Sequence, residues 1–312
     1  MAPHSKGAVL VTGLHGFTGG YIEAVLREAG YEVFGLVSGP PRGQHEYQVD
    51  IRDMPAVASM VDAIAPDYVI HLAAVSFVEH GDAGEIYDVN VKGTLNLIEA
   101  LRKSRRPLRK LLVASSGNIY GASATDKPVT EDTTPRPLNH YGISKFAAEL
   151  ISKLASGMIP LVIARPFNYT GIGQPDNFIV PKLVTAFQNG KRDIRLGNID
   201  AVRDFSDVRW MVRIYLSLIE SGISDEAVNI CSERGVRIRD VLHELEKIAG
   251  YQMRIETDET LLRAHEVQYL VGSSRKLEKL IKIPQRPTLP ETLAWMYAAG
   301  SSDLIHGAAE TG

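Results

Sequence analysis

Residues 9–22 read VLVTGLHGFTGGYI, an apolar run followed by three glycines at a spacing of three, Gly13, Gly16 and Gly19. The apolar run predicts a buried strand, and the pattern after the glycines predicts a helix. Glycine at such a turn lets the backbone bend sharply and approach a ligand, while the free amides at the helix start face an anion. The segment predicts a dinucleotide-binding loop, with a plain tight turn as the alternative reading of its GxxGxxG spacing.

The same alternation of strand and helix continues through the first half of the chain. The expected strands are AVLVTG at 8–13, EVFGLV at 32–37, YVIHLAA at 68–74, KLLVAS at 110–115 and PLVIARPF at 160–167. The expected helices lie near 18–29, 54–64 and 84–104 and after residue 139. Continuously apolar strands separated by helices indicate a parallel sheet that is buried on both faces. We therefore expect an α/β doubly wound parallel sheet, a Rossmann fold, with a smaller C-terminal substrate-binding lobe.

Composition narrows the classes of partner. The 312 residues carry a formal net charge of −3 without a basic block, which argues against nucleic acid or an anionic membrane as a partner. The single cysteine, Cys231, excludes an internal disulfide, and the histidines show no metal-ligand spacing. The start MAPHSKG does not resemble a signal peptide, and no apolar run is long enough to span a bilayer. We expect a cytoplasmic protein without a metal.

The second expected strand bears on the choice of cofactor. Sites that select NAD usually place an acidic residue near the end of this strand, where it binds the ribose 2′-hydroxyl. Here the sequence is LVSGPPRG, with no carboxylate at 37–39, and Arg42 is close enough to meet a 2′-phosphate. NADP(H) is therefore favoured, NAD(H) is possible, and a merely solvated Arg42 is the alternative. Asp50 and Ile51 fall where an adenine would be flanked at the end of the third strand.

The stretch NHYGISK at 139–145 places Tyr141 and Lys145 four residues apart at an expected helix start. Residues four apart lie on one face of a helix, so the ammonium group can lie near the phenol. Such a neighbour favours the phenolate and makes tyrosine a usable general acid or base. Taken alone, the pair is better explained as a half-buried tyrosine beside a solvated lysine.

Four motifs together resemble the extended short-chain dehydrogenase/reductases that act on nucleotide sugars. They are the glycine loop, HLAA at 71–74, ASSGNIYG at 114–121 and YGISK at 141–145. The resemblance implies that Tyr141 donates or accepts a proton, that Lys145 holds the nicotinamide ribose and lowers the Tyr141 pKa, and that Ser116 hydrogen-bonds the reacting oxygen. A strand-end hydroxyl that caps a turn is the alternative for Ser116.

The resemblance also assigns a set of cofactor-binding residues. Besides Arg42, Asp50, Ile51, Tyr141 and Lys145, they are Gly13, Gly16, Phe17, Thr18, Gly19, Leu72, Ala73, Ala74 and Asn90. Asn90 in such enzymes supports the active-site backbone or a water molecule, although a polar packing residue would give the same pattern.

The residues beside Ser116 indicate the reaction. Related dehydratases carry acidic residues directly after the catalytic hydroxyl, whereas this chain has Gly117 and Asn118, which cannot transfer a proton in that role. Related GDP-fucose synthases use a cysteine in this turn and a histidine in the loop after RPxN, and the segment NYTGIGQPDNF contains no histidine. Dehydration and epimerisation at C3 and C5 thus have no evident acid and base, which leaves a reductase or a 4-epimerase.

Further segments resemble the GDP-6-deoxy-D-mannose reductases and their dehydratase relatives. They are ARPFNYTGIGQPDNFIVPKL at 164–183, GNIDAVRDFSDV at 197–208, VNICSERGVRIRDVL at 228–242 and RAHEVQYLVGSSRKL at 263–277. The substrate-binding residues that this likeness implies are Ser76, Asn118, Asn168, Val180, Lys182, Arg203, Arg263 and Glu266. An ion pair with Asp204 or Asp207 is the alternative for Arg203, and a surface charge is the alternative for Glu266. Ala264 replaces the proline that the family has in this last loop.

By resemblance we expect NAD(P)H-dependent reduction of the C4 ketone of GDP-4-dehydro-6-deoxy-D-mannose to GDP-6-deoxy-D-mannose. Hydride transfer to the opposite face would give GDP-6-deoxy-D-talose, and no residue decides between the two products. The alternatives are a nucleotide-sugar 4-epimerase with retained NAD and a non-catalytic dinucleotide-binding regulator. Residues 1–167, joined by about 205–232, are assigned to the NAD(P)-binding domain and 168–312 mainly to the nucleotide-sugar lobe. Relatives dimerise through the helix near 84–104 and the Tyr141 helix, so a homodimer is expected.

Overall fold

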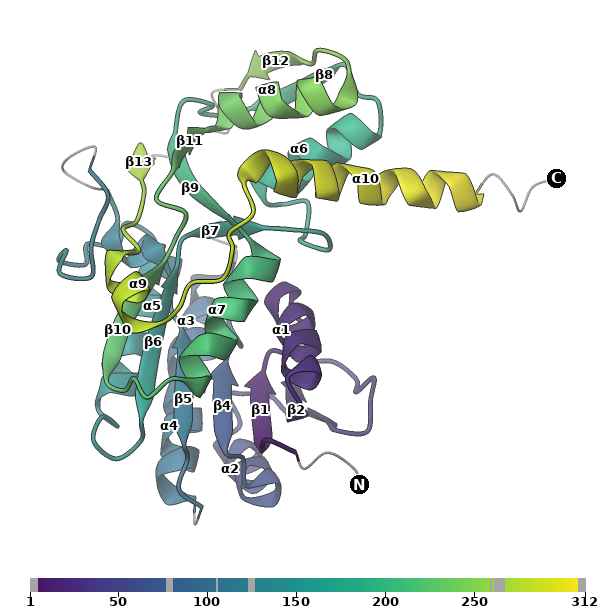
Figure 1. Cartoon of the computed structure of the whole chain (residues 1–312). Helices are drawn as coiled ribbons and strands as arrows, with labels where there is room; N and C mark the ends of the chain where they lie inside the picture. Colours follow the sequence, from purple (N-terminus) through teal and green to yellow (C-terminus); the bar gives the residue numbers. More distant parts are fainter. Residues whose placement is uncertain are drawn as a thin grey trace.

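The computed structural model describes residues 5–76, 81–104, 106–122, 127–258, 260 and 267–307, with side chains up to Gly300. Within these residues seven strands form a parallel sheet in the order β10-β6-β5-β4-β1-β2-β3 (Figure 1). The strands are β1 (Ala8–Thr12), β2 (Glu32–Val37), β3 (Glu46–Gln48), β4 (Tyr68–His71), β5 (Lys110–Ala114), β6 (Leu161–Pro166) and β10 (Glu226–Ile230). Strand order reverses between β1 and β4, and ligands of such sheets bind outside the carboxyl ends of the strands at this point.

Helices cover both faces of the sheet, as the apolar strands predicted (Figure 1). Helices α1 (Phe17–Glu28) and α7 (Val208–Glu220) pack against each other on one face, and α2 (Met54–Ile64) and α4 (Gly93–Lys103) on the other. Helix α5 (His140–Lys153) lies beside α4. Successive apolar residues of the inner strands point into opposite cores. The prediction of a doubly wound α/β fold is confirmed.

The long helix expected near 84–104 is present but is not uniform. It consists of α3 (Ala83–Tyr87), a π-helical turn η1 (Asp88–Lys92) and α4. A side chain on Gly93 would meet Cγ2 of Ile51 at 2.6 Å, so glycine is needed where this helix passes the turn that follows β3. Single π-helical turns are frequent at functional sites, and this one carries Asn90.

The second part of the molecule is smaller and lies beyond the carboxyl ends of the sheet (Figure 1). Its strands are β7 (Asn168–Thr170), β8 (Asp193–Leu196), β9 (Val202–Asp207), β11 (Gly235–Arg237), β12 (Arg254–Thr257) and β13 (Tyr269–Leu270). Its helices are α6 (Ile179–Gln188), α8 (Ile238–Ala249) and the first part of α10 (Leu289–Gly307), and a short helix α9 (Arg275–Leu280) contacts β10. These elements enclose a separate apolar core around Phe187 and Leu245.

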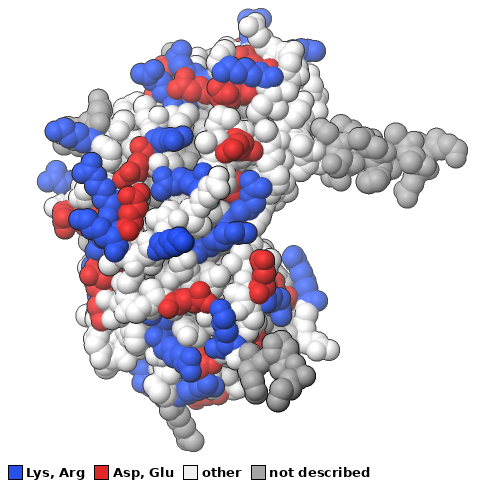
Figure 2. Space-filling model, in the orientation of Figure 1, with Lys and Arg blue, Asp and Glu red and all other residues white. Residues whose placement is uncertain are grey.

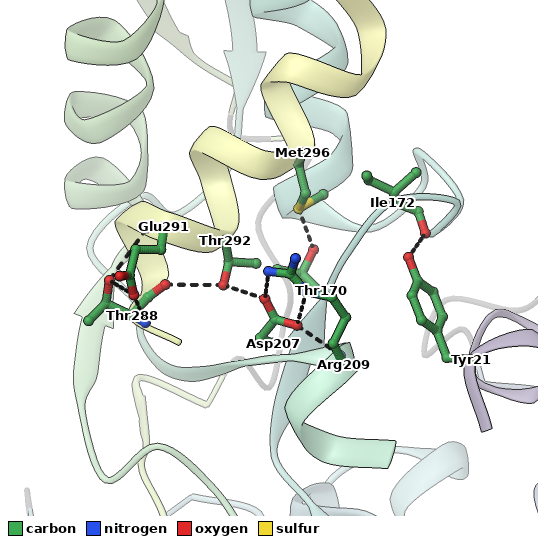
Figure 3. Close-up of polar contacts among 9 residues, drawn as sticks. All are labelled: Tyr21, Thr170, Ile172, Asp207, Arg209, Thr288, Glu291, Thr292 and Met296. Carbon is green, nitrogen blue, oxygen red and sulfur yellow. Dashed lines mark hydrogen bonds and ion pairs between the residues drawn. The ribbon is translucent and has the colours of Figure 1, made fainter. Parts of the chain in front are cut away.

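The chain passes between the two parts repeatedly, and polar contacts tie them where β9 meets α7. Asp207 begins α7 and accepts hydrogen bonds from the amide of Arg209 at 2.8 Å and from the hydroxyl of Thr292 in α10 at 2.8 Å (Figure 3). Tyr21 of α1 donates to the carbonyl of Ile172 at 2.7 Å. The smaller part is therefore fixed directly to the helices that cover the sheet.

The surface carries both signs of charge. On the face drawn in Figure 2, Lys and Arg are interspersed with Asp and Glu, without a broad area of one sign. Among the helices that the structure describes, none is long and apolar enough to cross a bilayer.

Candidate active site

The glycine loop lies between the carboxyl end of β1 and the start of α1. Gly13 has φ +75°, and a side chain there would meet the backbone nitrogen and Cα of Ala73 at 2.9 Å. The loop therefore passes directly over the end of β4, and the predicted residues Leu72, Ala73 and Ala74, all half-buried, lie beside it. This close approach joins two of the predicted cofactor segments in one place.

The start of α1 offers free backbone donors. Gly16 precedes the helix and has no side chain to cap it. The first amides of a helix have no partner within the helix, and the positive end of its dipole favours an anion. The next residues, Phe17 and Thr18, are half-buried and buried, so the donors lie in a partly enclosed loop. The loop thus fits the pyrophosphate of a dinucleotide.

The predicted adenosine residue Arg42 contacts a carboxylate that the sequence prediction did not include. Glu46 of β3 accepts hydrogen bonds from the amide of Arg42 at 2.6 Å and from Nε2 of His15 in the glycine loop at 2.6 Å. Its pKa is lowered, chiefly by the Arg42 amide and also by His15. The sequence prediction considered an acidic residue only at positions 37–39, at the end of β2. Glu46 lies on the neighbouring edge strand β3.

The other two predicted adenosine residues differ in exposure. Asp50 is exposed and forms an ion pair with Arg52 at 2.7 Å, which holds the pKa of its carboxyl low. Ile51 is buried in the core under α2 and α4, and its carbonyl accepts a hydrogen bond from Asn96 at 3.0 Å. Only Asp50 therefore presents a side chain to solvent at this edge.

Tyr141 and Lys145 lie in the first two turns of α5, and both are buried. Asn139 starts the helix by accepting a hydrogen bond from the amide of Gly142 at 2.8 Å. A side chain on Gly142 would meet the carbonyl of Asn118 at 2.8 Å, so the helix packs closely on the turn that follows β5. This contact brings Tyr141 next to Ser116, which begins that turn.

Burial dominates the acidity of Tyr141. The pKa of its phenol is raised well above 10, first by burial and then by Tyr169, and only hydrogen bonding with Ser116 lowers it. The expectation that Lys145 lowers this pKa is wrong for this structure, because the loss of solvation outweighs other influences. The phenol is therefore protonated at neutral pH and has a proton to donate.

Lys145 is less basic than an ordinary lysine. Burial lowers its pKa to about 8, and the carboxylate of Glu149, one turn further along α5, opposes this shift. Glu149 is itself fully buried and forms a two-pronged ion pair with Arg165 of β6, with distances of 2.9 and 2.7 Å. A buried ion pair therefore lies directly behind the lysine.

Ser116 and Asn118 are bonded to each other. The Ser116 Oγ accepts hydrogen bonds from the backbone amide of Asn118 at 3.1 Å and from its side-chain Nδ2 at 3.1 Å. Asn118, expected to bind substrate, thus holds the predicted catalytic serine.

Asn90 is buried, and its side chain is engaged by the protein. Its Oδ1 accepts from the amide of Val75 at 2.8 Å, and its Nδ2 donates to the carbonyl of Val75 at 3.0 Å and to the hydroxyl of Ser144 at 2.9 Å. Ser144 in turn donates to the carbonyl of Tyr141 at 2.8 Å. Asn90 therefore supports the backbone on either side of the site. It was predicted among the cofactor-binding residues, and its side chain contacts Val75 and Ser144.

His71 at the end of β4 continues this network. The Thr94 hydroxyl donates to the carbonyl of Asn90 at 2.6 Å, so it accepts from Nε2 of His71 at 2.9 Å. His71 is then neutral, and its Nδ1 accepts from the hydroxyl of Thr12 at 2.7 Å. Burial lowers the pKa of His71 to about 3, with a further contribution from Lys145.

The buried His71 predicts a loss of stability in acid. Unfolded His71 binds a proton below about pH 6.5, while the folded side chain does so only near pH 3, so its contribution is present above pH 6.5 and is lost as the pH falls. Between pH 6.5 and 4.5 this amounts to about 2 kcal/mol of unfolding free energy. Urea unfolding at several pH values should show a shallower acid slope in His71→Gln than in the parent protein. Equal slopes would contradict the assignment of a neutral, buried imidazole.

The predicted substrate residues are divided between the sheet and the smaller part of the molecule. Asn168 is half-buried at the start of β7, Ser76 is exposed after β4, and Lys182 of α6 lines a hollow of about 800 Å³ together with Lys191 and Arg195. The Val180 side chain is buried in the core of the lobe, where it packs against apolar neighbours.

For Arg203 the two suggested ion-pair partners have other contacts. Asp204 accepts from the amides of Ser232 at 2.6 Å and Glu233 at 2.9 Å, and Asp207 pairs with Arg209. Arg203 donates to the carbonyl of Val202 at 2.9 Å. Arg263 and Glu266 lie outside the described residues.

Tyr169 is a further residue that the sequence reasoning missed. Its hydroxyl lies 2.8 Å from that of Thr18 in the glycine loop, and its ring stacks on Phe17 with the centroids 5.9 Å apart. Tyr169 also raises the pKa of Tyr141. Tyr169 thus connects the glycine loop with the predicted catalytic tyrosine. Its position directly after Asn168 in FNYTG is the feature of the sequence that could have indicated it.

The glycine loop over β4 and the tyrosine and lysine of α5 beside a strand-end serine define the extended short-chain dehydrogenase/reductases. Comparison with known families agrees with this class. The model of the NAD dependent epimerase/dehydratase family matches residues 9–231, and the chain belongs to this family. The family and the geometry of the loop together support a nicotinamide dinucleotide as cofactor.

Three known proteins indicate which members of this family the chain is similar to. The chain is 35% identical to the GDP-6-deoxy-D-talose 4-dehydrogenase of Aggregatibacter actinomycetemcomitans, over 86% of this chain and 89% of that protein. It is 33% identical to the GDP-6-deoxy-D-mannose reductase of Pseudomonas aeruginosa, over 86% and 89% of the two chains. The solved structure of RMD from Pseudomonas aeruginosa complexed with NADPH superposes with a TM-score of 0.83 at 29% identity, over 95% of this chain and 99% of that one. The chain is thus similar to nucleotide-sugar oxidoreductases.

Proposed function

We propose that the protein reduces the C4 ketone of GDP-4-dehydro-6-deoxy-D-mannose to GDP-6-deoxy-D-mannose. The observation that carries the proposal is the arrangement of a protonated, buried Tyr141 next to a Ser116 whose oxygen is already engaged as an acceptor. Such a pair can donate to an oxygen that gains negative charge. The likeness to a GDP-6-deoxy-D-mannose reductase and a GDP-6-deoxy-D-talose dehydrogenase supports a GDP-linked sugar as substrate.

In this reaction the nicotinamide dinucleotide, when bound, supplies the hydride. Ser116 would orient the ketone oxygen by donating a hydrogen bond, and Tyr141 would transfer its proton to that oxygen as negative charge develops. Lys145, with its pKa of about 8, is partly protonated at neutral to slightly alkaline pH and would bind the ribose hydroxyls. Burial of both α5 residues excludes water from the proton transfer.

We infer that NADP(H) is preferred over NAD(H). Within the described residues, the guanidinium of Arg42 makes no hydrogen bond or ion pair, whereas the nearby Glu46 is engaged by His15 and by the Arg42 amide. A free arginine fork is well suited to a 2′-phosphate. The NADPH in the superposed structure of RMD is consistent with this preference.

Two other outcomes have specific support. The relative that is a GDP-6-deoxy-D-talose 4-dehydrogenase favours, as a second candidate, hydride exchange on the opposite face of the same carbon. Membership of the epimerase/dehydratase family keeps a 4-epimerase with retained NAD as the third.

A coupled assay tests the proposal. A dehydratase generates GDP-4-dehydro-6-deoxy-D-mannose, the protein is added with NADPH or NADH, and the loss of absorbance and the NMR spectrum of the product are recorded. We expect faster oxidation of NADPH than of NADH and a product with the manno configuration. A talo product would establish the second candidate, and an unchanged ketosugar with tightly bound NAD in the purified protein would favour the epimerase.

We propose in addition that the protein is a homodimer. Helices α4 and α5 and the segments that flank α5 expose several large apolar side chains, from 40% to 73% of their surface. They are Leu95, Leu138, Ile143, Leu150, Leu154 and Met158. A second copy of the same face would cover them by symmetric packing of helices. A sedimentation mass equal to one chain would contradict the dimer.

A further inference from the structure

We propose that Asn118 is a positioning residue that sets the direction of the Ser116 hydroxyl proton. The proposal rests on the ketone reduction proposed above and concerns how the serine is made a donor. Within the described residues, the Ser116 Oγ accepts hydrogen bonds from two groups of the same residue, the backbone amide and the side-chain Nδ2 of Asn118, each at 3.1 Å.

A hydroxyl group has two acceptor positions and one proton. With both acceptor positions filled by Asn118, the oxygen of Ser116 has only its proton left to offer. Asn118 lies on one side of that oxygen, so the proton points away from the turn and toward Tyr141, whose phenol is hydrogen-bonded with Ser116. The serine is therefore prepared as a donor at the place where the ketone oxygen would lie, before any substrate binds.

The backbone around Asn118 is held rigidly. Its carbonyl accepts from the amide of Gly121 at 3.3 Å and lies under α5, where a side chain on Gly142 would meet it at 2.8 Å. Gly117, the preceding residue, lies against the ring of Phe167, which a side chain would meet at 3.1 Å. The turn therefore cannot rotate to offer Ser116 a different partner without moving the helix that carries Tyr141.

The chemistry of residue 118 then matters more than its size. An amide donates to Ser116, whereas an ionised carboxylate of the same shape can only accept and would take the serine proton for itself. The hydroxyl would turn toward the carboxylate, and Tyr141 and the ketone oxygen would lose their donor. Protonation of that carboxyl would restore a donor and return the hydroxyl to its original direction.

The test compares Asn118→Asp with Asn118→Ala over a range of pH. For Asn118→Asp we expect kcat to fall about 100-fold at pH 8 and to recover progressively as the pH falls through the pKa of the new carboxyl, with KM for the cofactor unchanged. Asn118→Ala keeps the backbone donor and should show a smaller loss that does not depend on pH. In a Ser116→Ala background, the change to aspartate should have no further effect, because the hydroxyl that it misdirects is gone.

A second readout does not depend on turnover. With tyrosine labelled at the ring carbon that bears the oxygen, the Tyr141 resonance, assigned by its absence in Tyr141→Phe, should titrate with the carboxyl of Asn118→Asp and stay constant in Asn118→Ala. If the resonance titrates but the parent protein leaves the ketosugar unchanged, the proposed reaction fails and the positioning role stands. If Asn118→Asp behaves like Asn118→Ala in both measurements, the positioning role is wrong.

Discussion

Replacement of Tyr141 by phenylalanine should lower kcat for the ketosugar by about 10²- to 10⁴-fold, because the variant lacks the proton that the C4 oxygen must receive. The ring itself is buried beside Ser116, and phenylalanine fills the same space, so the fold should be retained. Cofactor affinity, measured by NADPH fluorescence, should change little, since Lys145 and the glycine loop are untouched. The measurement is single-turnover reduction followed by absorbance.

Tyr120 offers the matched control. It is an equally buried tyrosine, but its hydroxyl donates to Asn229 at 2.7 Å and accepts from Arg165 at 2.9 Å, away from Ser116. Tyr120→Phe should therefore lower stability and leave the chemical step nearly intact. A Tyr141→Phe variant that keeps a tenth or more of the parent kcat would show that another group donates the proton.

Replacement of Glu149 by glutamine should destabilise the protein by about 3 to 5 kcal/mol, because it leaves the guanidinium of Arg165 buried without its counter-charge. The side chains of this pair are 0% and 4% exposed, and Ser115 also donates to Glu149 at 2.5 Å, so no water can replace the lost carboxylate. Urea unfolding followed by circular dichroism measures the loss. The same change should lower the pKa of Lys145 further, since Glu149 opposes the effect of burial on it.

A surface pair provides the comparison. Glu99 and Arg102 form an ion pair at 2.8 Å on α4, with about a third of each side chain exposed. Glu99→Gln should cost less than about 1 kcal/mol, because water solvates both charges. If Glu149→Gln cost no more than this, the buried pair would not be a significant source of stability.

The sequence predicted the sheet well because its strands are buried on both faces and therefore apolar throughout. The glycine loop was located correctly for a similar reason, since the close approach of Gly13 to Ala73 requires glycine. Ser116 was expected at a strand end, and Tyr141 lies beside it because α5 packs closely on the turn that follows β5.

Contacts between distant segments were harder to predict. Glu46 reaches His15 from an edge strand of three residues, and Tyr169 reaches Thr18 across the junction of the two parts of the molecule. No periodicity marks either pair. The acidity of Tyr141 was also misjudged, because helical spacing gives the distance to Lys145 but not the depth of burial, and burial has the larger effect.

The repeated passage of the chain between the sheet and the lobe limits how such a protein can diversify. β6 leads almost directly into β7, β9 into α7, and β10 into β11, so each part is assembled from several separate stretches of sequence. A single recombination event in the gene cannot exchange one lobe for another as a block. New sugar specificity in this architecture must instead arise from point substitutions and loop changes, each of which has to keep Asp207, Arg209 and Thr292 in contact.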